Sequence, residues 1–247
     1  MNLLQLLDLP EPLCTALVGA GGKTTALFSL ARQVDGPAWV TTSTHLGTDQ
    51  AIHADRHFIM HDASDFKPEL YNQARVTLIT GPVTPDDRLH SPAPDLMEQI
   101  HSHADREGIS LLIESDGSRS LPLKAPGDHE PPIPLWVTSV IVLVGFSGIG
   151  RRLTAESVFR PERFSQLTGL PLGEIITPES VCKLLLHPLG GMKNIPAGAF
   201  KMVLFNQAES ALARETVAKI APDLLRGGYD RVVAGGMKSA PNDLVCF

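Results

Sequence analysis

A glycine-rich segment near the start of the chain constrains the fold more than any other feature. It reads Gly-Ala-Gly-Gly-Lys-Thr-Thr over residues 19–25, between an apolar run at residues 13–18 and a helical pattern at residues 23–33. Glycines let a backbone approach a ligand, and N–H groups at a helix N-terminus attract anions. A lysine and a following hydroxyl then neutralise phosphates and ligate Mg²⁺. The segment therefore predicts a phosphate-binding loop made of Gly19, Ala20, Gly21, Gly22, Lys23, Thr24 and Thr25.

The spacing of this loop departs from the usual one. The common pattern is G-x-x-x-x-G-K-[ST], but here Leu17 stands five residues before Gly22, and the first glycine, Gly19, stands three residues before it. Such a short loop is similar to that of the peptidoglycan Mur ligases, in which Gly-Thr-Asn-Gly-Lys-Thr-Thr is common. The alternative is a glycine-rich turn between a strand and a helix, with Lys23 in solvent.

Apolar runs alternate with helical segments along the chain, which predicts an α/β fold. Strands are expected at residues 13–18, 38–41, 57–60, 76–79, 111–113, 140–144, 202–205 and 231–234. Helices are expected at residues 23–33, 95–107, 178–187 and 209–220. The alternation favours a mostly parallel sheet of the P-loop NTPase type with helices on both faces. We expect a single nucleotide-binding domain over residues 1–247, with a small, mainly helical insertion at residues 146–200.

Composition excludes several classes of protein. The net charge of −6 gives no overall basic field for nucleic acid or an anionic membrane, and the longest basic cluster is Arg151-Arg152. No window approaches the ~18 apolar residues that a membrane helix needs. The three cysteines are far apart and odd in number, which argues against a disulfide framework and indicates a cytoplasmic protein.

Two carboxylates follow the apolar run at residues 111–113. Glu114 and Asp116 are two positions apart, so both leave a strand on the same side. P-loop proteins place a carboxylate near Mg²⁺ at the end of a neighbouring strand. We expect the Mg²⁺ ligands to be Thr24, Thr42, Glu114 and Asp116. The alternative is that these acidic and hydroxyl-bearing strand ends only satisfy turns.

A proline-stiffened segment at residues 118–131 follows the carboxylates and carries Arg119, Lys124, His129 and Glu130. Ligands bind at the carboxyl ends of strands in open α/β sheets, which places this segment near the predicted loop. Lys124 and Arg119 could bind phosphate or an acidic substrate. His129 and Glu130 could transfer protons or bind a metal. The expected catalytic residues are Lys23, Glu114, Asp116, Lys124 and His129. A solvated surface loop is the alternative for this segment.

The segment Asn206-Gln207-Ala208-Glu209 follows a predicted strand, where GTPases carry Asn-Lys-x-Asp. In that motif the Asp pairs with guanine N1 and N2, and the Lys covers the base. Glu209 is one methylene longer than that Asp, so both ATP and GTP are retained as cofactors, and Asn206 is expected to contact the nucleotide. The alternative is a helix start with Asn206 as N-cap and Glu209 at its third position.

In their order along the chain, these motifs resemble those of the bacterial YqeC family. The resemblance extends over about residues 13–240. It rests on residues 19–25, 41–45, 114–117, 121–126, 129–131 and 160–162. The family is described as accessory proteins of selenium-dependent hydroxylases. The resemblance therefore implies a role in maturing molybdenum enzymes that carry labile selenium, with such an enzyme as partner.

Three functions fit these motifs. The first is a Mg²⁺-dependent NTPase that uses ATP or GTP to assist the maturation of a selenium-dependent molybdenum hydroxylase. The second is a Mur-like ligase or kinase that passes the γ-phosphate to a small acceptor held by Arg119, Lys124 and His129. The third is a nucleotide-gated scaffold with negligible turnover.

Overall fold

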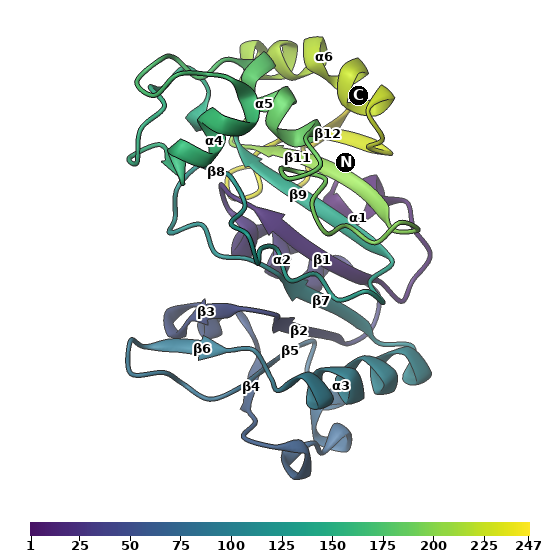
Figure 1. Cartoon of the computed structure of the whole chain (residues 1–247). Coiled ribbons are helices and arrows are strands. Elements are labelled where there is room, and N and C mark those ends of the chain that lie inside the picture. The colour runs from purple at the N-terminus through teal and green to yellow at the C-terminus, as the bar shows by residue number, and fades with distance from the viewer.

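The computed structural model describes the backbone of residues 1–247 and every side chain except that of Asn72. Its centre is a nine-stranded sheet (Figure 1). In spatial order the strands are β13 (Val245–Cys246), β12 (Arg231–Gly235), β11 (Phe200–Asn206), β9 (Ser139–Gly145), β1 (Cys14–Gly19), β7 (Ser110–Glu114), β2 (Ala38–Thr42), β5 (Val76–Thr80) and β4 (Arg56–Ile59). Neighbouring strands are parallel, except that β13 pairs antiparallel with β12.

Helices cover both faces of this sheet (Figure 1). The α-helices are α1 (Leu3–Leu7), α2 (Lys23–Gln33), α3 (Pro94–Glu107), α4 (Pro161–Thr168), α5 (Pro178–Leu186) and α6 (Ala211–Arg226). Short 3₁₀ helices are η1 (Thr48–His53), η2 (Ala63–Asp65), η3 (Pro68–Gln73) and η4 (Phe146–Gly148). Across the described residues, no helix is long and apolar enough to cross a bilayer.

The alternation of side chains along the strands creates two apolar cores, one on each face of the sheet. On β9, Val140, Val142 and Val144 belong to a core shared with α3, α5 and α6. Ile141 and Leu143 belong to the other core, which is shared with α1 and α2. Because these strands are buried on both faces, their sequences are continuously apolar.

This architecture confirms the predicted fold class, a mostly parallel α/β sheet with helices on both faces. The last helix differs most from its predicted bounds. It begins at Ala211, with Ser210 as its N-cap, and continues through Pro222 to Arg226. The alternative in which Asn206 caps this helix is therefore wrong, because Asn206 is the last residue of β11.

Two small sheets lie outside the main one and had no sequence signal. β3 (His45–Gly47) pairs antiparallel with β6 (Arg88–His90), and β8 (Leu123–Lys124) pairs parallel with β10 (Val158–Phe159). β10 lies with α4 and α5 in residues 146–200, which connect β9 to β11. Strands of two or three residues are too short to show a periodic pattern.

The order of the strands has a switch point at β1. β7 and β2 lie on one side of β1, whereas β9, β11 and β12 lie on the other. Because the strands are parallel, the loops that follow β1, β7, β9 and β11 gather at one edge of the sheet. Open α/β sheets bind their ligands in the crevice at such a point.

Candidate functional site

The glycine-rich loop connects β1 to α2. Gly19, Gly21 and Gly22 have φ angles of 94°, 86° and 114°, in the left-handed region that favours glycine. A Cβ on Gly21 would lie 2.3 Å from the backbone of Gly145, and a Cβ on Gly19 would lie 2.3 Å from the Leu143 carbonyl oxygen. Any larger residue would push the loop away from β9. The glycines therefore keep the loop close to β9, with the N-terminus of α2 directly behind it.

Lys23, the first residue of α2, folds back over the loop. Its side chain is 3% exposed, and Nζ donates to the Gly19 carbonyl oxygen at 2.9 Å. Nζ also lies 3.3 Å from Asp116 Oδ1 and 3.9 Å from Glu114 Oε1. A buried ammonium is costly unless it is paired, and these oxygens compensate it. The loop thus holds one fixed positive charge beside its backbone.

Thr24 and Glu114 form a second polar pair beside the loop, where the Thr24 hydroxyl donates to Glu114 Oε2 at 3.0 Å. Burial raises the pKa of Glu114, and Lys23 and Thr24 offset this rise only in part. A cation would stabilise such a carboxylate. The described residues contain no group of three or more His, Cys, Asp or Glu side chains that could hold a metal ion. Proteins commonly bind Mg²⁺ through one or two carboxylates together with substrate phosphates and water, so Thr24 and Glu114 could serve as its protein ligands.

Asp116 is placed differently from Glu114. Its two carboxylate oxygens accept the Gly19 N–H at 3.0 and 3.1 Å, and Oδ2 lies 2.9 Å from Lys124 Nζ. Asp116 is 2% exposed and is not among the residues that line the cavity above the loop. Its charge therefore fixes the end of β1 and the neighbouring lysines. Direct contact between Asp116 and a metal stays a prediction.

Lys124 and Glu130 extend this ion-pair network away from the cavity. The Lys124 side chain is 1% exposed, and Nζ lies 2.8 Å from Glu130 Oε2 and donates to the Gly117 carbonyl oxygen at 2.6 Å. Glu130 Oε2 in turn lies 2.7 Å from an Arg160 guanidinium nitrogen. His129 is exposed and lines a separate open hollow with Arg160. The structure thus places Lys124 and His129, both expected to be catalytic, outside the cavity above the loop.

Thr42 holds the end of β2 against β7. Its buried hydroxyl donates to the Glu114 carbonyl oxygen at 2.8 Å and accepts the Thr44 N–H at 3.1 Å. Thr42 does not line the cavity. Its hydroxyl is used within the protein, so its predicted contact with Mg²⁺ would require these bonds to be exchanged.

Asn206, at the end of β11, supports the loop from the other side. Its Nδ2 donates to the Gly21 carbonyl oxygen at 2.7 Å, and its Oδ1 accepts the Met237 N–H at 2.8 Å. The following residue, Gln207, lines the cavity with a φ of 64° and accepts a hydrogen bond from the Ser147 hydroxyl at 2.6 Å. Asn206 therefore contacts the loop backbone, while Gln207 is the residue of this segment that a ligand could reach.

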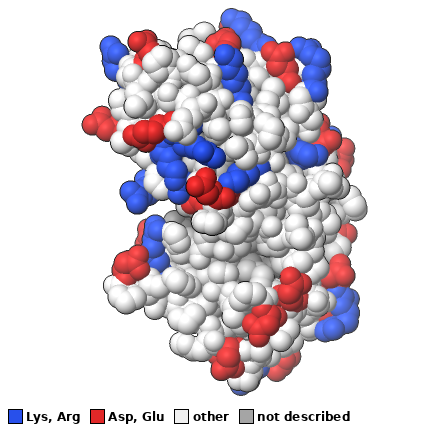
Figure 2. Space-filling view, in the orientation of Figure 1, with Lys and Arg blue, Asp and Glu red and all other residues white. Residues whose placement is uncertain are grey.

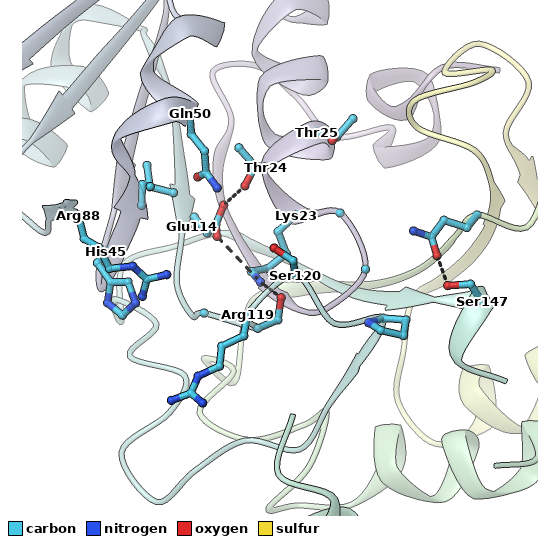
Figure 3. A pocket seen from close by; sticks show the side chains of 18 of the residues that line it. Lys23, Thr24, Thr25, His45, Gln50, Arg88, Glu114, Arg119, Ser120 and Ser147 are labelled. Carbon is cyan, nitrogen blue, oxygen red and sulfur yellow. Dashed lines mark hydrogen bonds and ion pairs between the residues drawn. The ribbon is translucent and has the colours of Figure 1, made fainter. Parts of the chain in front are cut away.

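A cavity of about 470 Å³ opens above the loop (Figure 3). Lys23, Thr24 and Gln207 line it. Its volume falls within the range of about 300–1,000 Å³ that is common for small-molecule sites. Sequence reasoning missed several other lining residues, among them Gln50 in η1 and Arg88 in β6. Neither has a motif around it, and Arg88 lines the cavity only because β6 pairs with β3, far away in the sequence.

Comparison with known proteins finds the same family that the sequence motifs resemble. The model of a family described as "YqeC protein" matches residues 15–162. A protein of Escherichia coli (strain K12) named "Uncharacterized protein YqeC" is 31% identical over 221 residues, which cover 83% of this chain and 80% of that protein. No solved structure gives a significant match to the chain.

Proposed function

The chain belongs to the YqeC protein family, and we propose that it is a Mg²⁺-dependent nucleoside triphosphatase of the P-loop type. One observation carries this proposal: the buried Lys23 ammonium and the Thr24–Glu114 pair lie side by side at the N-terminus of α2. An ammonium at this point attracts the β- and γ-phosphates, and a hydroxyl beside a carboxylate provides oxygen ligands for Mg²⁺.

Binding would start with the N–H groups of the loop and the dipole of α2, which both favour an anion. Lys23 Nζ would exchange its bond to the Gly19 carbonyl for phosphate oxygens, while Asp116 keeps hold of the Gly19 N–H. Thr24 and Glu114 would hold Mg²⁺ directly or through water. Phosphoryl transfer depends mainly on positioning and on charge stabilisation, and these residues supply both.

The family resemblance extends the proposal to a cellular role, in which the triphosphatase cycle assists the maturation of a selenium-dependent molybdenum hydroxylase. The segments that would respond to the γ-phosphate are residues 41–45 and 117–124. They lie close together, since a Cβ added to Gly117 would lie 3.5 Å from His45 Nε2. A client enzyme could sense a change in either segment. ATP and GTP are both retained as substrates. In the segment that corresponds to the guanine-binding motif of GTPases, the residue that a ligand could reach is Gln207, which does not select one base.

Phosphate release from Mg-ATP and from Mg-GTP tests this proposal. We expect the full-length protein to release phosphate from at least one of them. Lys23→Ala should lower the rate at least about tenfold, since a hydrogen bond to a charged group contributes about 1.5–3 kcal/mol. The matched control is Lys219→Ala, which removes an exposed lysine from α6.

Three outcomes would contradict the proposal. If nucleotide binds but no phosphate appears, the protein is a nucleotide-gated scaffold. If Lys23→Ala releases phosphate as fast as the Lys219→Ala control, the turnover does not come from this loop. Release that begins only when a metabolite extract is added would favour the ligase or kinase instead.

A further inference from the structure

We propose that the cavity binds a second, separate anion beside the nucleotide: a small ligand that carries phosphate or carboxylate groups. This inference rests on the proposed nucleotide site and adds to it the class of the second ligand. It is carried by three arginines that line the cavity, Arg88, Arg119 and Arg151.

None of these three guanidinium groups has an ion pair or a hydrogen bond to any described residue. Elsewhere in the described structure, arginines are commonly neutralised by Asp or Glu. Such pairs involve Arg32, Arg106, Arg160, Arg163, Arg214, Arg226 and Arg231. A guanidinium stays charged at any ordinary pH and binds carboxylate or phosphate through two parallel hydrogen bonds. Cations without partners, gathered in one cavity, form a receptor for an anion.

The backbone of Arg88 is fixed, although its side chain has no partner. Arg88 pairs with Gly47 across the β3–β6 ladder, its carbonyl oxygen accepts the Thr84 N–H at 2.8 Å, and its own N–H donates to Thr84 Oγ1 at 3.2 Å. His45 lies beside it (Figure 3). Burial, together with Arg88 and His90, lowers the pKa of His45. The lowered pKa favours the neutral form of His45, which adds a hydrogen-bonding group without adding charge.

Arg119 is held in an unusual backbone conformation. Arg119 and Ser120 have φ angles of 51° and 59°, which cost non-glycine residues about 1–2 kcal/mol each. The Arg119 guanidinium carbon lies 4.9 Å from the centre of the Phe159 ring, so a cation–π contact restricts its direction. Backbone strain of this kind clusters at ligand-binding segments. With this left-handed backbone, Arg119 lies at the wall of the cavity.

The charged side chains that line the cavity are mainly cationic. Four of them are cations and one is a carboxylate. Because Lys23 is already paired with Asp116 and Glu114, the three arginines carry the positive charge that is free to attract a second anion. In Figure 2, Lys and Arg lie on both walls of the hollow at the left of the molecule, with Asp and Glu beside them.

The positions of the arginines separate the two anions. Figure 3 shows Arg88 and Arg119 on the opposite side of the cavity from Thr25 and Ser147. A nucleotide with its base near Ser147 and its phosphates at Lys23 would leave the Arg88–Arg119 side free. The second anion would bind there, next to the γ-phosphate.

Calorimetric titration tests this inference with inorganic phosphate and citrate as separate probes. Each is titrated into the full-length protein saturated with Mg²⁺ and a non-hydrolysable triphosphate. We expect one equivalent of at least one probe to bind while the triphosphate stays bound. Arg88→Gln and Arg119→Gln should each weaken this binding about tenfold, since each removes a charged hydrogen-bond donor. Which probe binds more tightly identifies the phosphate- or carboxylate-bearing class.

The control is Arg106→Gln, which removes the same charge from an exposed residue of α3, and it should leave the affinity unchanged. Three results would overturn the inference. The first is that neither probe binds up to high millimolar concentration. The second is that a probe binds only when the triphosphate is replaced by a diphosphate. The third is that both arginine variants lose as much affinity for the triphosphate as for the probe. Tight nucleotide binding in these experiments leaves the proposed function standing, whereas absent nucleotide binding contradicts the function itself.

Discussion

At the residue scale, the two neighbouring carboxylates Asp116 and Glu114 have different roles in the site. Asp116 holds the Gly19 N–H and a lysine of the 118–131 segment, whereas Glu114 shares a hydrogen bond with Thr24 and lines the cavity. The two residues look equivalent in the sequence because they are two positions apart on one strand end. Their surroundings make one a structural anchor and the other a candidate metal ligand.

This difference predicts distinct effects of two isosteric variants. Glu114→Gln should weaken nucleotide binding mainly when Mg²⁺ is present, because it removes an oxygen charge beside Thr24. Asp116→Asn should weaken binding equally with and without Mg²⁺, and should lower the free energy of unfolding by about 3 kcal/mol, because it leaves buried lysines uncompensated. Titration in magnesium and in EDTA, together with urea unfolding, measures both. Identical profiles for the two variants would contradict the division of tasks.

The glycines of the loop allow a matched comparison. Gly21 and Gly36 both have positive φ angles, 86° and 73°. A Cβ on Gly21 would collide with the Gly145 backbone, whereas nothing lies within 4 Å of a Cβ on Gly36. Gly36→Ala should cost about 1–2 kcal/mol from backbone strain alone, and Gly21→Ala about 3 kcal/mol or more, with loss of nucleotide binding. Equal unfolding energies in urea would show that the loop can move away from β9.

At the scale of elements, a chain of ion pairs links the loop to the small β8–β10 sheet and α4. It runs from Asp116 through Lys124 and Glu130 to Arg160, the N-cap residue of α4. Each partner is buried or half-buried, so each charge depends on its neighbour. This network fixes the segment that follows the carboxylates, which appears in the sequence only as a proline-rich loop.

The network predicts a pH dependence of stability. Burial alone would raise the pKa of Glu130, but the hydrogen bonds from Arg160 and Lys124 lower it to about 2. In the unfolded chain the pKa of this glutamate is about 4.5. Because folding lowers the pKa, ionised Glu130 stabilises the fold fully above pH 4.5, and this stabilisation is lost as the pH falls toward 2. Glu130→Gln should lower the unfolding free energy at pH 7 by about 2 kcal/mol and flatten its fall between those pH values.

Urea unfolding between pH 2 and pH 7 measures this effect. The matched control is Glu215→Gln, which changes an exposed carboxylate on α6 that has no ion pair among the described residues. It should leave the stability profile as it is. A Glu130→Gln profile parallel to that of the native protein would show that the Glu130 pairs contribute nothing.

The elements also show what the sequence could and could not predict. The loop and Glu114 were predictable because strand, loop and helix follow one another, so local pattern determines their placement. Arg88 was not, since three-residue strands carry no period and its place depends on pairing with residues some forty positions away. Lys124 was expected beside the phosphates, but pairing of β8 with β10 buries it among carboxylates. Asn206 contacts Gly21 across 185 residues, a contact that local pattern cannot reveal.

At the scale of the whole molecule, the parallel sheet brings distant segments to one edge. The loops after β1, β7, β9 and β11 meet there, with the β3–β6 pair as an outer wall. The chain as a whole has a net charge of −6, yet four of the five charged side chains that line the cavity at this edge are cations. The local reversal of charge favours a small anion over a polyanion, because the rest of the surface would repel nucleic acid.

The affinity of the Lys23→Ala variant for Mg-ATP and Mg-GTP, measured by calorimetric titration, tests the central claim most directly. The account predicts that the native protein and Lys219→Ala bind one equivalent of nucleotide with equal affinity. It predicts that Lys23→Ala binds at least about tenfold more weakly, because the ammonium above the Gly19 carbonyl is lost. An unchanged affinity in Lys23→Ala would contradict the assignment of residues 19–25 as the phosphate-binding loop.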